Sequence, residues 1–143
     1  DVHIDLDKGE ATVKDKDGNV KDTRQLKNLV VTAGLGYIAS RMKEATADAM
    51  THMAIGTGTT AAAAGQTALV TEAARQSLTS TTVSSNTVEY VAAFAAGTGT
   101  GAITEAGVLN AASGGTMLCR TVFSVVNKGA SDSMTITWTI TIS

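Results

Sequence analysis

The 143-residue sequence contains no proline, one cysteine, and aromatic residues at only 3% of the chain. The single cysteine, Cys119, excludes a disulfide within the chain and a metal site built from several cysteines. No apolar run reaches the ~20 residues that a membrane-spanning helix needs, so we expect no membrane partner. The formal net charge of −2 offers no basic surface to a phosphate backbone, so we expect no nucleic-acid partner either.

Small residues dominate the composition, because alanine, threonine and glycine together make up half of the chain after residue 45. Such side chains bury little apolar area each, and apolar burial contributes ~25 cal/mol per Å² to stability. The length suits one domain. The composition therefore indicates a single domain to which binding of neighbouring chains adds stability.

The charged first segment, residues 1–26, predicts a solvated hairpin or arm that belongs to the same unit as the rest. Asp17-Gly18 lies between two strand-like runs, Glu10–Asp15 and Val20–Leu26, and Asp-Gly in that position is a strong turn signal. A calcium-binding loop is the alternative interpretation of the same acidic residues. The positions that need Gly and Glu in such a loop hold Val20 and Leu26, so we interpret the segment as a turn.

The remaining residues, 27–143, predict a mainly β fold with one helix over Ala33–Ala45. The apolar stripe of that helix, at helical spacing, consists of Leu35, Ile38, Ala39 and Met42. Short strands separated by small-residue loops are expected at His52–Ile55, Ser77–Ser84, Thr87–Ala95, Ala102–Leu109, Met117–Val126 and Ser133–Ile142. Regularly spaced short strands predict a sandwich or a barrel, and of the two we expect a single antiparallel β-sandwich.

Two strands show a clear alternation of core-facing and solvent-facing residues. In Ser133–Ile142, Met134 and every second residue after it are apolar, and the residues between them are threonines. In Thr87–Ala95, the same alternation places Val88, Tyr90, Ala92 and Phe94 on one face and Glu89 on the other.

No residue pattern selects a catalytic, cofactor or metal site, so we expect a protein that is not an enzyme. The Gly56–Thr60 stretch lacks the third glycine of a dinucleotide fingerprint and the lysine of a phosphate loop. Neither His3 nor His52 has a second ligand at metal-binding spacing. We interpret Cys119 as a buried hydrophobe, with Arg120 on the opposite face of its strand. The acidic residues after position 50 select no pair; they are Glu72, Glu89, Glu105 and Asp132.

Several motifs occur together in a fixed order over roughly residues 20–143: Lys27–Met42, Met53–Thr60, Gly65–Leu69, Glu72–Arg75, Gly101–Gly107 and Thr135–Ile140. As an ordered set they resemble small structural proteins of tailed bacteriophages, some labelled tail-fibre-like and some similar to capsid cement proteins with jelly-roll-like folds. The resemblance carries no catalytic residues. It implies a part of the virus particle, made in the cytoplasm of the bacterial host.

The resemblance leads us to expect a cement or decoration protein on the capsid exterior. Its partners would be the major capsid protein and further copies of itself, as a dimer or a trimer. The expected contact residues come from the charged arm and the Gly/Thr loops: Lys14, Lys16, Asp17, Lys21, Arg24, Thr57, Thr59, Thr98 and Thr100. The alternative is a tail-fibre or receptor-binding module.

Overall fold

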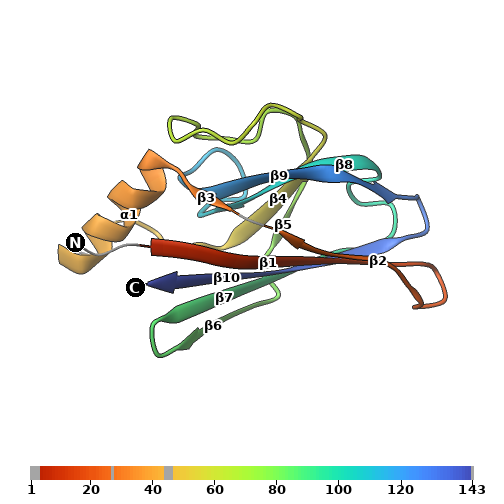
Figure 1. Ribbon diagram of the computed structural model, residues 1–143, viewed down its shortest axis with the longest axis horizontal. Helices are drawn as coiled ribbons and strands as arrows, with labels where there is room; N and C mark the ends of the chain where they lie inside the picture. The colour runs from red at the N-terminus through yellow and green to blue at the C-terminus, as the bar shows by residue number, and fades with distance from the viewer. Residues whose placement is uncertain (1–3, 27, 44–46, 143) are drawn as a thin grey trace.

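The computed structural model of the chain describes residues 4–26, 28–43 and 47–142. Ten strands in these ranges form two five-stranded antiparallel sheets that pack face to face, and one helix lies at an end of the sandwich (Figure 1). The first sheet has the order β2 (Val20–Leu26), β1 (Ile4–Lys14), β10 (Ser133–Ile142), β7 (Thr87–Phe94) and β6 (Ser80–Ser84). The second has the order β3 (Leu29–Val30), β9 (Met117–Lys128), β8 (Gly101–Leu109), β4 (His52–Gly56) and β5 (Glu72–Ser77). The predicted antiparallel β-sandwich is therefore confirmed.

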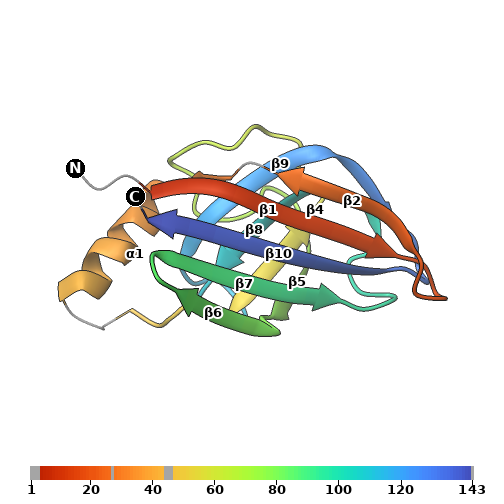
Figure 2. The same ribbon diagram turned by 60° about the horizontal axis from the view of Figure 1, so that its bottom comes forward.

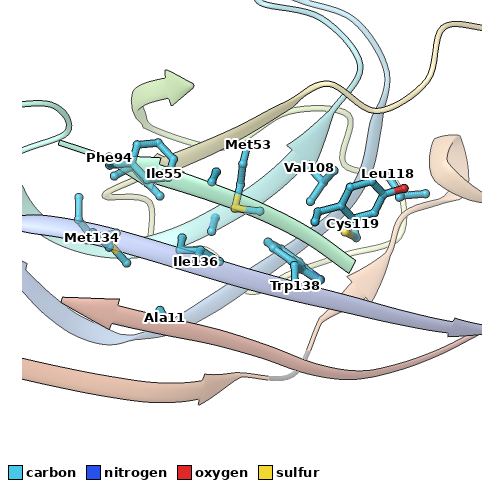
Figure 3. Close-up of a cluster of buried hydrophobic side chains, with 14 of the residues drawn as sticks. Ala11, Met53, Ile55, Phe94, Val108, Leu118, Cys119, Met134, Ile136 and Trp138 are labelled. Carbon is cyan, nitrogen blue, oxygen red and sulfur yellow. The ribbon is translucent and has the colours of Figure 1, made fainter. Parts of the chain in front are cut away.

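The core lies between the two sheets and follows the predicted alternation. Met134, Ile136, Trp138 and Ile140 of β10 are buried, whereas Ile142 at the end of the strand is 39% exposed. Figure 3 shows the β10 side chains beside Met53, Ile55, Val108 and Cys119 of the other sheet. Tyr90, Ala92 and Phe94 of β7 are also buried in the core, and Glu89 is exposed, as expected.

The N-terminal hairpin is part of the first sheet, which corrects the expectation of a solvated arm. Strand β1 pairs with β2 along one side and with β10 along the other. Ala11 and Val13 are buried in the core because alternate residues of β1 face the second sheet. The predicted turn is confirmed: Gly18 has a φ of +83°, and the Asp15 carboxylate accepts hydrogen bonds from the backbone N–H groups of Asp17 and Asn19.

Helix α1 (Thr32–Lys43) forms where it was expected, and its predicted end at Ala45 lies outside the described residues. The predicted apolar stripe is only partly buried, since Leu35 is 49% and Met42 82% exposed, whereas Ile38 packs against the core. The helix packs through Gly34, Tyr37 and Ile38. A Cβ atom at Gly34 would collide with the Leu118 carbonyl of β9, so the missing side chain determines which face of the helix lies against the sheet.

The predicted strand Ser77–Ser84 is two strands in different sheets. Strand β5 ends at Ser77 and β6 begins at Ser80, and the short connection carries the chain from the second sheet to the first. The Leu78 N–H donates to the Thr51 carbonyl and the Thr79 N–H to the Val91 carbonyl, so each end of the connection is attached to a different sheet. Strand β5 and the short β3 were not expected, because neither run has the alternation of a half-buried strand.

Candidate functional site

A long connection between β4 and β5, residues 57–71, crosses the outer face of the second sheet, and we call it the strap (Figure 1). Glu105 of β8 lies beneath it and is fully buried. Its carboxylate accepts hydrogen bonds from the backbone N–H groups of Gly58 at 3.0 Å, Val70 at 3.0 Å and Thr71 at 2.7 Å. One carboxylate thus binds both ends of the strap.

Arg120 of β9 is the partner of this carboxylate and is also fully buried. One terminal nitrogen of its guanidinium lies 2.7 Å from Glu105 Oε2, and its Nε donates to the same oxygen at 2.9 Å. The remaining donors reach the middle of the strap, at the Gln66 side-chain oxygen (2.8 Å) and the Thr60 carbonyl (3.0 Å). Every part of the ion pair therefore contacts either the other partner or the strap.

The close packing at this site explains why glycine occurs twice in the Gly-Thr-Gly-Thr repeat of residues 56–59. A Cβ atom at Gly56 would lie 2.7 Å from Glu105 Oε1, and one at Gly58 would lie 2.8 Å from the Val70 Cβ. Glycine at both positions allows the strap backbone to approach the carboxylate closely enough to donate hydrogen bonds. The close approach of the strap to Glu105 therefore accounts for the glycines of the repeat.

The pKa of Glu105 is lowered by its surroundings although the side chain is buried. Burial alone raises the pKa of a carboxyl group, because it disfavours the charged form. Hydrogen bonds from Thr71, Val70, Arg120 and Gly58 stabilise the carboxylate by more than burial destabilises it, so the pKa falls below the ordinary 4.5. The group is a fixed carboxylate with all its bonding capacity engaged, which suits a structural anchor rather than an acid–base catalyst.

A second set of buried charges lies at the end of the sandwich that holds the β1–β2 turn, which we call the hairpin end. Lys128 of β9 is buried and donates to the carbonyls of Ala95 and Asp132. Lys21 of β2 forms an ion pair of 2.6 Å with Asp132. These bonds connect the hairpin, the loop after β7 and the turn before β10, so the loops of this end are held together. The Lys21 ammonium group and the Gly129 N–H lower the pKa of Asp132.

All of the predicted contact residues except Arg24 lie at the hairpin end or on the strap. The hairpin end holds Lys14, Lys16, Asp17 and Lys21, together with Thr98 and Thr100 in the loop 95–100. Arg24 lies further along β2, where it pairs with Asp22 and donates to the carbonyls of Ser124 and Val125. Thr57 and Thr59 are exposed on the strap. Their contact with a partner stays a prediction.

The opposite end of the sandwich, which we call the helix end, contains an apolar pocket of about 340 Å³ between α1 and the first sheet. Its walls include Tyr37 and Ile38 of α1, Val88 and Tyr90 of β7, Val83 of β6, and Ile140 of β10. Arg41 lies at the wall and donates to the Ala47 carbonyl. Two of the lining side chains, Val83 and Ile142, are exposed to solvent, and so are Leu35 and Met42 of α1.

The remaining residues that the sequence singled out have ordinary structural environments. Cys119 is buried in the core and burial raises the pKa of its thiol, as expected for a packed hydrophobe, while Arg120 lies on the opposite face. His52 is half-buried, with its Nδ1 atom 2.8 Å from Thr51 Oγ1, whereas His3 lies outside the described residues. The described ranges contain no cluster of three potential metal ligands. None of their helices is long and apolar enough to span a membrane.

The Glu105–Arg120 pair leaves one weak signal in the sequence, since each residue interrupts a largely apolar strand. Their contact depends on a register shift in β8 between Ile103 and Glu105, which places Thr104 and Glu105 beneath the strap while Ile103 and Ala106 remain in the core.

Comparison of the chain with protein-family models, curated protein sequences and solved structures finds no match.

Proposed function

We propose that this chain is a non-enzymatic structural protein of a tailed-bacteriophage particle, which binds the outer capsid surface as a cement protein. It would bridge neighbouring subunits of the major capsid protein and stabilise the shell. The proposal starts from the ordered motifs of residues 20–143 that resemble phage structural proteins. The geometry adds support of two kinds, from the exposed apolar surface and from the use of the buried charges.

The observation that carries the proposal is the exposed apolar surface at the helix end. Met42 is 82% and Leu35 49% exposed on the side of α1 that does not pack, because residues seven positions apart lie on one face of a helix. Val83 is 70% exposed at the pocket nearby. Exposed apolar groups gathered at one place mark surfaces that bind other proteins. The helix end is therefore the surface that we assign to attachment.

The buried charges support a framework role. Glu105 and Arg120 hold the strap, and Lys128 holds the loops of the hairpin end, so these groups are engaged within the chain. A cement protein needs loops of fixed shape, because repeated weak contacts add up only when all of them fit at once. The exposed hairpin-end residues, such as Lys14 and Lys16, would supply a second, polar contact with the shell.

The test adds the purified protein to shells assembled without it and measures the temperature at which the shells break. We expect the protein to raise this temperature and the Leu35→Ser/Met42→Ser variant to raise it less. Val125→Ser is the matched control, because Val125 is an exposed apolar residue of β9. Lys14→Ala/Lys16→Ala tests the hairpin end in the same assay. Shells whose stability is unchanged by the protein would contradict the proposal.

A tail-fibre or receptor-binding module is the alternative function, and the structure offers it less support. Sugar-binding surfaces commonly present exposed aromatic rings, but Trp138, Phe94 and Tyr90 are buried in the core. Tyr37 and Phe123 are only partly buried and pack against the same core. Electron microscopy of labelled particles separates the two functions, since label at the tail instead of the head would establish the alternative.

A further inference from the structure

The two sheets have four edge strands, β2 and β6 in the first sheet and β3 and β5 in the second. These strands differ in how they are protected from pairing with another chain. Strand β2 carries Lys21, Asp22 and Arg24, all engaged in ion pairs within the chain. Strand β5 carries Glu72 and Arg75, which pair with each other, and Arg75 also binds the carbonyls of Ala111 and Gly114. Strand β3 has only two residues. Charges and short length are the usual means of preventing edge-to-edge association.

Strand β6 has none of these protections. Its sequence, Ser-Thr-Thr-Val-Ser, contains no charge, no proline and no glycine, and all five residues are exposed. It pairs with β7 on one side only and forms the outer edge of the first sheet (Figure 2). Alternate residues of an edge strand direct their backbone N–H and C=O groups outward, where they are available to another strand.

We propose that two copies of this chain pair through β6, antiparallel and related by a two-fold axis at Thr82. The two first sheets would then form one continuous sheet across the dimer. Antiparallel pairing of a strand with its own copy is the simplest closed interface, because the same surface serves on both sides. The dimer uses the sheet edge and leaves the exposed face of α1 free for the attachment proposed above, with which it shares only Val83.

The sequence of β6 matches itself in this register. Thr82 would lie opposite Thr82 of the other copy, Ser80 opposite Ser84, and Thr81 opposite Val83. Each pair joins residues of similar size, and no like charges meet. Thr81 and Val83 face the pocket, whereas Ser80, Thr82 and Ser84 occupy the alternate positions of the strand. The dimer would therefore cover part of the exposed Val83 side chain with a β-branched threonine of the partner.

The absence of charge on β6 favours a second copy of this chain over an unrelated extended segment as the partner of this edge. A neutral strand meets no electrostatic penalty with its own copy, and the strand supplies no charge with which to select a different partner. Like charges placed directly opposite each other across two strands destabilise pairing, whereas opposite charges stabilise it. The Ser80–Ser84 pairing therefore provides a direct way to test both the interface and its register.

The experiment measures the mass in solution of the full chain by light scattering during size-exclusion chromatography. The unmodified protein should have twice the 14.5 kDa mass of one chain. The Ser80→Lys/Ser84→Lys variant places lysines opposite each other and should fall to the mass of one chain. Its matched control, Ser80→Lys/Ser84→Glu, places opposite charges together and should remain a dimer. Circular dichroism of both variants checks that each keeps its β structure.

A cross-linking measurement supplies an independent check. Cys119 is buried, so Thr82→Cys introduces a single accessible thiol at the proposed axis. Mild oxidation should convert this variant to a covalent dimer, and the equivalent Thr23→Cys variant on β2 should not cross-link. A one-chain or three-chain mass for the unmodified protein overturns the proposal. So does equal behaviour of the two double variants. Shell binding by the dissociated variant would leave the proposed attachment intact.

Discussion

Glu105 shows how one residue holds a connection whose own sequence has little to hold it. The strap is rich in alanine and threonine, and it has few side chains that bury much apolar area. Its backbone N–H groups instead find a carboxylate that is itself neutralised by Arg120. Removing one partner of a buried pair leaves an uncompensated charge, which is more costly than the pair is stabilising. Glu105 is therefore important to the stability of the fold, although it is fully buried and cannot contact another chain.

The first prediction is that Glu105→Gln lowers the free energy of unfolding by about 3–5 kcal/mol, as expected for a broken buried pair. The substitution keeps the size of the side chain but leaves the Arg120 guanidinium without a negative partner. Urea unfolding followed by the fluorescence of Trp138 measures the change. Glu89→Gln is the matched control, because Glu89 is exposed on β7. A loss no larger than that of the control would show that the pair does not hold the strap.

The second prediction concerns acid. The pKa of Glu105 is lower in the folded protein than the 4.5 of an ordinary glutamate, so its stabilising contribution is complete above pH 4.5. That contribution is lost as the pH falls through the folded pKa. We expect the unfolding free energy of the unmodified protein to fall more steeply in this range than that of Glu105→Gln. The pKa of Asp132 is also lowered by folding, but this group contributes equally to the unmodified protein and to the variant. Parallel curves of unfolding free energy against pH for the two proteins would therefore contradict the assignment to Glu105.

Sequence reasoning succeeded at the residue scale where burial alone decides the outcome. Cys119 and the alternating residues of β10 follow from the two-residue period of a strand. The Glu105–Arg120 contact could not be predicted, because it joins residues on two strands whose register shifts between Ile103 and Glu105. Such a shift depends on how the whole sheet is assembled, and no local sequence pattern predicts it.

At the scale of elements, α1 was found at nearly its predicted position but turned to a different face. The prediction counted apolar residues only, and Leu35 and Met42 dominated that count. The close approach of Gly34 to the Leu118 carbonyl determines the contact instead, so a small residue outweighs large ones. The strap contributes to the same junction, since the Ala64 carbonyl accepts a hydrogen bond from the Thr32 N–H at the start of the helix.

The third prediction compares the two glycines of α1. Gly34→Ala should destabilise the protein by roughly 1–3 kcal/mol, because the new methyl group has no space against β9 and overpacking has costs of this size. A Cβ atom at Gly36 meets nothing within 4 Å, so Gly36→Ala should stabilise by up to about 1 kcal/mol through helix propensity. Thermal unfolding of both variants measures the difference. Equal shifts in either direction would refute the packing that we describe for this helix.

At the scale of the whole molecule, the mainly β class and the sandwich were predictable, whereas the assignment of strands to sheets was not. The chain passes between the sheets in short connections, such as the one between β5 and β6, and nothing in Leu78–Thr79 distinguishes a crossing from a continuing strand. The hairpin of residues 1–26 was expected to be solvated because of its charges. Only its pairing with β10 shows that it completes the first sheet.

The fourth prediction follows from the single core shared by both sheets. Trp138 reports on the core and far-ultraviolet circular dichroism reports on all the strands, so the two signals should change together during urea unfolding. The hairpin should not unfold at a lower urea concentration than the rest, because Ala11 and Val13 belong to the same core. Two separate transitions would show that the hairpin is an independent unit.

The position of β10 between β1 and β7 also determines when this protein can fold during its synthesis. The ribosome makes β1 early and β10 more than a hundred residues later, a delay on the order of ten seconds at typical translation rates. Throughout that time β1 has no neighbour on the side where β10 will pair. The nascent hairpin is then open to pairing with hairpins on adjacent ribosomes of the same messenger. Slowing translation of the last strand should therefore increase aggregation of this protein in the cell.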